Sequence, residues 1–182
     1  MDISNSDIKI IVLPNEKKKA KEKQKKIQRQ RKITNEDRWK SNINETDLNA
    51  DNHIQLLHYL EQSPNCEKSK IIRRLIKQKI EGYHGQDTLK NKLNKDKFVT
   101  YQYVLDKLNQ EKLTCYYCLE KVLLLYSYAH DQKQWTLERI NNNFGHNYDN
   151  VEISCLKCNI KRRTMAYEKY KFTKQVKWIK ES

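Results

Sequence analysis

Apolar residues recur at helical spacing through the first half of the chain. Residues 53–62 carry such a pattern, and Ser63-Pro64-Asn65 interrupts it. Residues 68–81 predict a clear amphipathic helix, because large apolar side chains fall on one arc of its surface. These side chains are Ile71, Ile72, Leu75, Ile76 and Ile80. Gly82 is expected to end this helix, and Thr100 is expected to cap the start of a third helix.

The arc opposite these apolar residues is basic. It carries Lys70, Arg73, Arg74 and Lys77. Simple solvation explains such a face by default, and contact with the phosphates of a nucleic acid is the alternative. Arg73, Arg74 and Lys77 are therefore candidates for nucleic-acid binding.

The second half of the chain carries the pattern of a β-hairpin followed by a helix. Residues 134–140 predict one strand, and the alternating residues 151–155 predict a second. The ten residues between them form a polar loop around Gly145. Residues 156–170 predict a helix. The expected fold class is therefore α+β, with a helical region ahead of a strand–loop–strand–helix unit.

Positive charge is concentrated near the N-terminus. The chain has 182 residues, with 37 Lys and Arg against 23 Asp and Glu, and a formal net charge of +14. Residues 17–32 hold ten of the basic residues and one acidic residue, and Ile27 is their only large apolar side chain. This segment suits a solvated, largely disordered or helical arm. An arm that contacts phosphates, or a nuclear-targeting signal, is the functional interpretation.

The composition limits how the chain can be divided into domains and where in the cell the protein is expected. Only 37% of the residues are hydrophobic, so we expect a compact unit with a polar extension. We divide the chain into a basic arm over residues 1–50, a helical region over 51–112 and a C-terminal module over 113–182. The sequence has no run of 18 apolar residues and no secretory signal pattern. We therefore expect no membrane partner and an intracellular protein of the cytoplasm or nucleus, or of a virion if it is viral.

Four of the five cysteines form two Cys-x-x-Cys pairs. Cys115 pairs with Cys118 and Cys155 pairs with Cys158, and 36 residues lie between the pairs. Two such pairs can hold one tetrahedral Zn²⁺ at about 2.3 Å from each sulfur. Two disulfides or four unconnected thiols are the alternatives, and the odd Cys66 and the missing secretion signal disfavour disulfides. We expect a structural zinc site, with Cys66 as a free thiol.

The strand–loop–strand–helix unit also carries a series of short motifs. They are Thr136-Leu137-Glu138-Arg139-Ile140, Gly145-His146, Asn150-Val151, Cys155-x-x-Cys158-Asn159 and Lys161-Arg162-Arg163. In this order they resemble the HNH endonucleases, also called His-Me finger or ββα-metal nucleases. The likeness is to the zinc-knuckle branch found in phages and large DNA viruses, and it covers about residues 113–165. The resemblance implies a metal-dependent endonuclease that cuts or nicks DNA, with RNA as the alternative partner.

The same resemblance assigns roles to individual residues. The family's metal ligands fall on Glu138 and Asn159, whose oxygens suit Mg²⁺ or Mn²⁺ and leave positions open for water and phosphate. Asn150 would brace the loop, and a simple turn residue ahead of the strand is its other interpretation.

The general base is less directly assigned. Most family members carry a histidine where this chain has Arg139, which stays charged and would instead clamp the phosphate. His146 is then the candidate base, because its unperturbed pKa of about 6.5 suits that role. A local hydrogen-bonding role for His146 is the alternative.

Two further features bear on activity. Glu138 stands where the family has aspartate, and its extra methylene would displace the ion by about 1 Å. Lys161, Arg162 and Arg163 are placed to contact a DNA backbone, although basic residues at a helix end are also favourable for the helix dipole. A catalytically inactive module that binds DNA or RNA, and a structural nucleoprotein component, therefore stand as alternatives to the endonuclease.

Overall fold

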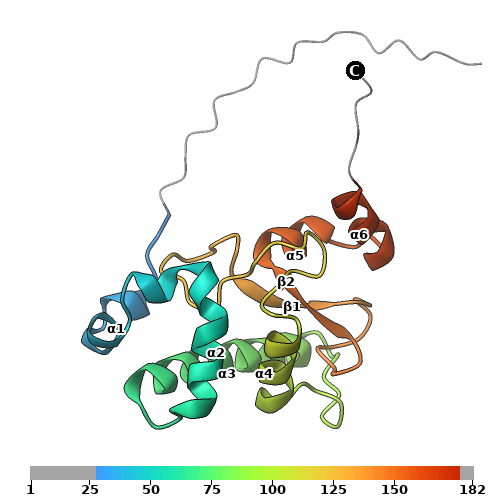
Figure 1. The fold of residues 1–182 in the computed structure, drawn as a ribbon. Coiled ribbons are helices and arrows are strands. Elements are labelled where there is room, and N and C mark those ends of the chain that lie inside the picture. Colours follow the sequence, from blue (N-terminus) through green and yellow to red (C-terminus); the bar gives the residue numbers. More distant parts are fainter. Residues whose placement is uncertain (1–27, 177–182) are drawn as a thin grey trace, which may run out of the picture.

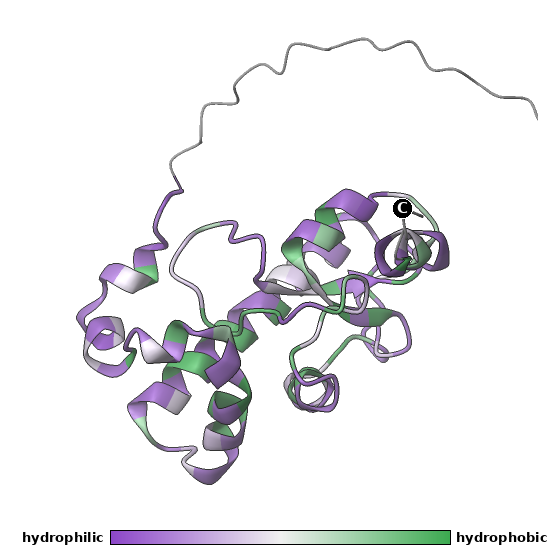
Figure 2. Cartoon of the chain, turned by 45° about the horizontal axis from the view of Figure 1, so that its top comes forward, coloured by the Kyte–Doolittle hydropathy of each residue, from purple (hydrophilic) through white to green (hydrophobic). Residues whose placement is uncertain are grey.

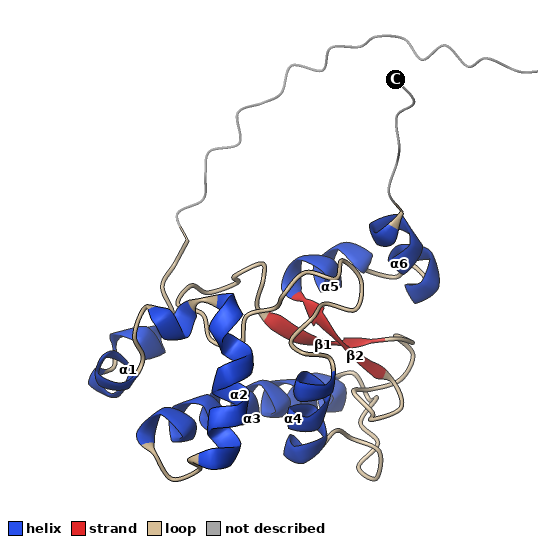
Figure 3. Ribbon diagram, viewed as in Figure 1, coloured by secondary structure: helices blue, strands red, loops and turns tan. Residues whose placement is uncertain are grey.

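The computed structural model describes residues 28–176 (Figure 1). The predicted arm lies outside the described residues as far as Ile27. In Figures 1 and 3, helices α1 to α4 gather on one side, and the β-hairpin with α5 and α6 lies on the other. The predicted α+β class, with a helical region ahead of a hairpin and helices, is confirmed.

The helical region contains α1 (Asp37–Asn42), α2 (His53–Gln62), α3 (Glu67–Leu89) and α4 (Tyr101–Gln110). The second part contains β1 (Trp135–Arg139), β2 (Val151–Cys155), α5 (Leu156–Arg162) and α6 (Tyr167–Gln175). Short 3-10 turns at Lys32–Asn35, Thr46–Leu48 and Ala50–Asn52 flank α1 and lead into α2.

Helix α3 is longer than the sequence pattern predicts. The expectation that Gly82 ends it is wrong, because the helix continues through Gly82 and Gly85 to Leu89. Each glycine weakens a helix interior by about 1 kcal/mol. The buried side chains of Ile80 and Asp87 hold this stretch against the rest of the protein, so tertiary packing overrides the local signal. Predictions for the other two helices are confirmed, including the Thr100 cap of α4.

Residues 28–50, which composition assigns to the arm, include part of the folded body. Trp39 in α1 is only 5% exposed, and Ile43 just after it is also buried. The backbone N–H of Arg31 donates to the Ser127 carbonyl at 2.9 Å, which ties this segment to the second part of the chain. The folded region therefore begins before residue 51, and buried Trp39 and Ile43 are among the side chains that anchor it.

Strands β1 and β2 form an antiparallel pair. Trp135 lies opposite Cys155, and Arg139 lies opposite Val151. Helix α5 begins directly after β2. The prediction of one helix over 156–170 is wrong, because the chain breaks at Arg163, whose φ of 52° lies in the left-handed region, and resumes as α6.

One hydrophobic core joins the helices to the hairpin. Figure 2 shows apolar and polar residues alternating around the helices, as expected for helices with one buried face. Fully buried members of the core come from both parts, and they include Leu57, Ile72, Leu108, Trp135 and Ile153. Within residues 28–176, no helix is long and apolar enough to cross a membrane.

His53 links the helical region to the segment that precedes the hairpin. Its ring is fully buried, with Nε2 at 2.9 Å from the Asp47 carbonyl oxygen and Nδ1 at 3.0 Å from the Leu124 backbone nitrogen. A backbone N–H only donates, so Nδ1 must be the accepting nitrogen and Nε2 carries the hydrogen. Burial lowers the pKa of His53, and the hydrogen bond to Asp47 offsets only part of this effect.

We expect His53 to make the protein less stable in mild acid. The unfolded chain binds a proton near pH ~6.5, whereas the folded protein binds it only at lower pH, so stability falls as the pH drops below about 6.5. Urea unfolding across this range should show a weaker pH dependence in His53→Gln. His58→Gln, which alters an exposed histidine of the same helix, should match the wild type. An unchanged pH dependence in His53→Gln would contradict this account.

Candidate active site and four-cysteine cluster

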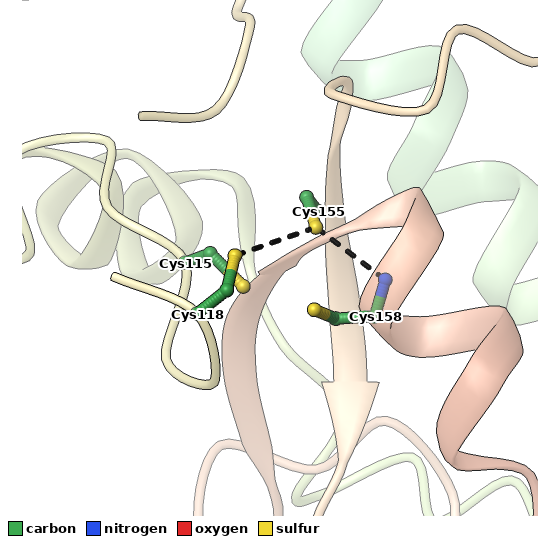
Figure 4. Close-up of side chains that lie close together, drawn as sticks. All are labelled: Cys115, Cys118, Cys155 and Cys158. Carbon is green, nitrogen blue, oxygen red and sulfur yellow. Dashed lines mark hydrogen bonds between the residues drawn. The ribbon is translucent and has the colours of Figure 1, made fainter. Parts of the chain in front are cut away.

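The four paired cysteines meet where the hairpin joins α5 (Figure 4). Cys115 and Cys118 come from the loop before the hairpin, Cys155 ends β2, and Cys158 lies in the first turn of α5. Their sulfur atoms lie within 4.8 Å of one another, and the Cys118 and Cys155 sulfurs are 3.9 Å apart. A tetrahedral Zn²⁺ bound at about 2.3 Å places its sulfur ligands about 3.8 Å apart. All four thiols are free of disulfides, so the cluster fits a structural zinc ion.

The surroundings of the cluster also suit a metal. Tyr170 on α6 is buried, and its hydroxyl has no hydrogen-bond partner among residues 28–176. Burial raises the pKa of Tyr170, and nearby Cys158 raises it further, so the hydroxyl keeps its hydrogen. A thiolate bound to zinc would accept this O–H. Cys66 lies apart from the cluster, where its sulfur caps the start of α3.

A cleft of about 470 Å³ opens between α3 and the hairpin. It is lined by Glu138, Arg139, His146, Asn159 and Arg163 from the second part of the chain. Four of the five side chains predicted to be catalytic therefore share one cleft, and only Asn150 is not part of its lining. Helix α3 supplies the facing wall with Lys79, Tyr83 and Gln86.

Glu138 is buried in this cleft, and its carboxylate is engaged by Arg162. Arg162 Nε donates to Glu138 Oε1, and the two side chains are 2% and 5% exposed. Arg162 also donates to the backbone carbonyls of Arg139 at 2.6 Å and Met165 at 2.8 Å. Burial raises the pKa of Glu138 to about 7, and the charge of Arg162 acts in the opposite direction.

This ion pair corrects one prediction. The sequence predicts that Arg162 contacts a nucleic-acid backbone, but the residue is 3% exposed and its donors are used inside the protein. Its bonds fix the end of α5 to β1. Lys161 and Arg163 remain exposed on either side of it.

Asn159 lies half-buried on α5 and faces β1. Its Nδ2 donates to Thr136 Oγ1 at 3.2 Å and to the Leu137 carbonyl at 3.4 Å. These bonds orient the side chain through its nitrogen and leave the carbonyl oxygen for a ligand. Within residues 28–176, the four cysteines are the only group of three or more clustered Cys, His, Asp or Glu ligands. A cation held by Glu138 and Asn159 would therefore take its other ligands from water and phosphate.

His146 is held by a residue that the sequence analysis does not identify. Its ring Nδ1 lies 2.9 Å from Oδ1 of Asp87, near the end of α3, and its ring stacks on Tyr83 with centroids 4.4 Å apart. Burial lowers the pKa of His146 to about 4, although Asp87 favours the charged form. Arg139 lies 4.0 Å from the Asp87 carboxylate and donates to the Phe144 carbonyl.

Asn150 acts on the shape of the loop between the strands. Its Oδ1 accepts the Asn141 backbone N–H at 2.9 Å, and its Nδ2 donates to the carbonyls of Asn141 and Gly145 at 3.0 Å. The side chain thereby bridges both ends of the loop and fixes the segment that carries His146.

The basic residues of α3 lie at a second site. Arg73, Arg74 and Lys77 line a shallow cleft of about 390 Å³ together with Lys70. Arg73 donates to the Pro64 carbonyl at 3.1 Å, and Arg74 pairs with Glu36 at 3.5 Å. Part of their hydrogen-bonding capacity is thus used within the protein. The structure does not bring these three residues to the cleft of Glu138.

Lys79 is a further cleft residue that the sequence analysis does not single out. Its ammonium group donates to the Trp135 carbonyl and to Gln134 Oε1, and lies 4.6 Å from the Trp135 ring centroid. Lys79 follows Ile76 by three residues and Leu75 by four, so helical spacing places it on the apolar arc, and this position is the signal that could have identified it. Only the packing of α3 against β1 brings it to the cleft.

Comparisons of this chain with protein families, with curated proteins and with solved structures give no match. The cleft and the four-cysteine cluster therefore carry the functional argument.

Proposed function

We propose that this protein is a zinc-stabilised HNH-type endonuclease that hydrolyses phosphodiester bonds in DNA with Mg²⁺ or Mn²⁺. One observation carries this proposal: an acid, an amide, a histidine and two arginines line a single cleft beside the four-cysteine cluster. Hydrolysis of a phosphodiester needs an activated water, neutralisation of the phosphate charge and a stabilised leaving oxygen. The side chains of this cleft have the chemistry to meet these needs.

Each side chain has a distinct part in this proposal. His146 takes a proton from the attacking water through Nε2, because Nδ1 faces Asp87. Burial lowers the pKa of His146 to about 4, so the ring is neutral at pH 7, and the Asp87 carboxylate at Nδ1 would stabilise the imidazolium formed when Nε2 takes the proton. Arg139 and Arg163 bind phosphate oxygens. Glu138 and Asn159 would hold the divalent ion, which when bound neutralises charge on the scissile phosphate.

The ion pair between Glu138 and Arg162 favours a second candidate function. Arg162 already neutralises the carboxylate, so Glu138 offers less negative charge to a cation than a free acid would. A module that binds DNA or RNA without cutting it needs no such ion, and it would use the exposed Lys161 and Arg163 together with the basic arm. This alternative predicts binding that weakens steeply with salt, without cleavage. A structural nucleoprotein component would show the same binding together with defined protein partners.

A plasmid assay separates these functions. The full chain, loaded with zinc, is mixed with supercoiled plasmid and either Mg²⁺ or Mn²⁺, and formation of the open-circular form is followed over time. The endonuclease predicts nicking that requires the added ion. Retarded but intact plasmid with every divalent ion tried would support the binding module and reject the enzyme. Parallel reactions with single-stranded DNA and RNA of matched length identify the preferred nucleic acid.

A further inference from the structure

We propose that Asp87, on helix α3, is a positioning residue for His146, which makes the helical region part of the catalytic unit. This inference rests on the proposed function, in which His146 is the general base. Asp87 lies 59 residues from His146 in the sequence and belongs to the other part of the chain. If the proposal holds, the helices do not form an independent binding module beside a self-sufficient nuclease.

A single carboxylate holds both the backbone and the ring of His146. Asp87 is fully buried, and its Oδ2 accepts the His146 backbone N–H at 2.5 Å. Its Oδ1 lies 2.9 Å from the ring Nδ1. An ionised carboxylate only accepts hydrogen bonds, so Nδ1 must carry the hydrogen. The ring therefore has one defined tautomer, with its lone pair on Nε2.

The lone pair on Nε2 faces the cleft. Nε2 has no hydrogen-bond partner among residues 28–176, it is not among their fully buried unpaired atoms, and His146 lines the cleft. A water in the cleft can therefore reach it. His146 is 4% exposed overall and is held by Asp87 and Tyr83, so its ring is fixed by its surroundings.

The remaining neighbours of the ring keep it neutral and oriented. Tyr83, one turn before Asp87 on α3, stacks against one face of the imidazole. Burial disfavours a positive charge on the ring, Asp87 favours it, and Arg139 on β1 and Lys90 just beyond α3 disfavour it to a smaller extent. Arg139 also lies near the Asp87 carboxylate and balances its buried charge. The pair is thus enclosed by groups from α3, β1 and the loop.

Gly145 makes this close approach possible. A Cβ at this position would lie 2.6 Å from Asp87 Oδ2 and 2.5 Å from the Lys92 carbonyl oxygen. Both distances are far below a normal contact, and the Lys92 atom belongs to the backbone, which cannot simply rotate away. The Gly145-His146 motif therefore has a physical basis: Gly145 leaves room for the Asp87 carboxylate, and His146 contacts that carboxylate through its backbone N–H and its ring.

A double-mutant cycle on plasmid nicking tests the coupling. His146→Gln should lower the nicking rate about a hundredfold or more, and Asp87→Asn about tenfold to a hundredfold, with a small change in KM. The asparagine cannot accept from both the backbone N–H and Nδ1, because one of its two atoms is a donor. Because Asp87 acts through His146, the double variant should match His146→Gln within about twofold. Losses that multiply across the two sites would overturn the proposal.

A second measurement tests the contact without reference to activity. Nitrogen NMR of the histidine rings in the folded wild type, assigned with His146→Gln, should show His146 as the neutral tautomer with hydrogen on Nδ1 at pH 7. Asp87→Asn and Gly145→Ala should both change this signal, while Asp106→Asn, on the exposed face of α4, should not. A wild-type ring with hydrogen on Nε2, or a charged ring, would overturn the proposal. A protein that shows the predicted tautomer but cuts no nucleic acid would reject the proposed nuclease activity and leave the contact between Asp87 and His146 in place.

Discussion

Replacing Cys158 with alanine is expected to abolish zinc binding and unfold the C-terminal module. Cys158 is buried and joins the hairpin to α5, so loss of its thiolate removes one ligand and a packing contact together. Zinc bound by such clusters contributes on the order of 10 kcal/mol to folding, comparable with the ~5–15 kcal/mol total stability of a domain. Circular dichroism and the zinc content of the purified chain measure the effect.

Cys66 provides the matched control for this prediction. Cys66→Ser keeps a side chain that can cap α3, so it should retain full zinc content and a folded spectrum. Removing zinc from the wild type with a chelator should reproduce the Cys158→Ala spectrum, and adding zinc back should reverse it. A folded, zinc-free Cys158→Ala protein would show that the cluster is not a structural metal site.

Replacing Glu138 with alanine is expected to destabilise the protein by about 3–5 kcal/mol, in addition to any loss of activity. The substitution leaves the Arg162 side chain, which is 2% exposed, without its carboxylate partner. Glu138→Gln, which keeps an acceptor for Arg162 Nε, should cost less. Urea unfolding at pH 7 measures these differences. An inactive Glu138→Ala protein is therefore weak evidence for a metal ligand.

Glu152 lies directly opposite Glu138 in the hairpin and serves as the control. It pairs with Lys107 at 2.9 Å, with 21% of its side chain exposed. Because this pair is more exposed than the pair of Glu138 and Arg162, and because Lys107 keeps Glu111 as a partner at 2.7 Å, Glu152→Ala should cost clearly less than Glu138→Ala. Equal losses for the two alanine variants would mean that the Glu138 ion pair is not buried in solution.

The parts of the fold that follow from local pattern were predictable. Helices α2 and α4 follow from apolar spacing and from a capping threonine, and the hairpin follows from alternation on either side of a polar loop. The two Cys-x-x-Cys pairs predicted the cluster for the same reason, since two short ligand spacings leave few other arrangements. Each of these signals is contained within a few residues.

The errors arise where distant residues decide the outcome. Gly82 lies inside α3, where the neighbouring Tyr83 accepts a hydrogen bond from the Leu137 backbone N–H of the hairpin. The helix expected over 156–170 is interrupted at Arg163, next to the Arg162 side chain that bonds back to β1. Basic character alone suggested that Arg162 faces a nucleic acid, and nothing local marks it as the partner of Glu138. No local sequence pattern marks Asp87 as a site residue, because its partner His146 is 59 residues away.

The measurement that most directly tests the nuclease is metal-dependent nicking by the wild type and by Asn159→Ala. Asn159 is half-buried, and its two side-chain hydrogen bonds within residues 28–176 are long, so its loss should leave stability and zinc content nearly intact, unlike the loss of Glu138. Ile160→Ala, at an exposed neighbouring position, is the control. We predict that the wild type and Ile160→Ala nick supercoiled plasmid with Mg²⁺ or Mn²⁺, and that Asn159→Ala is slower by at least about a hundredfold. Intact plasmid with folded, zinc-loaded wild type, or equal nicking by Asn159→Ala, would contradict the account.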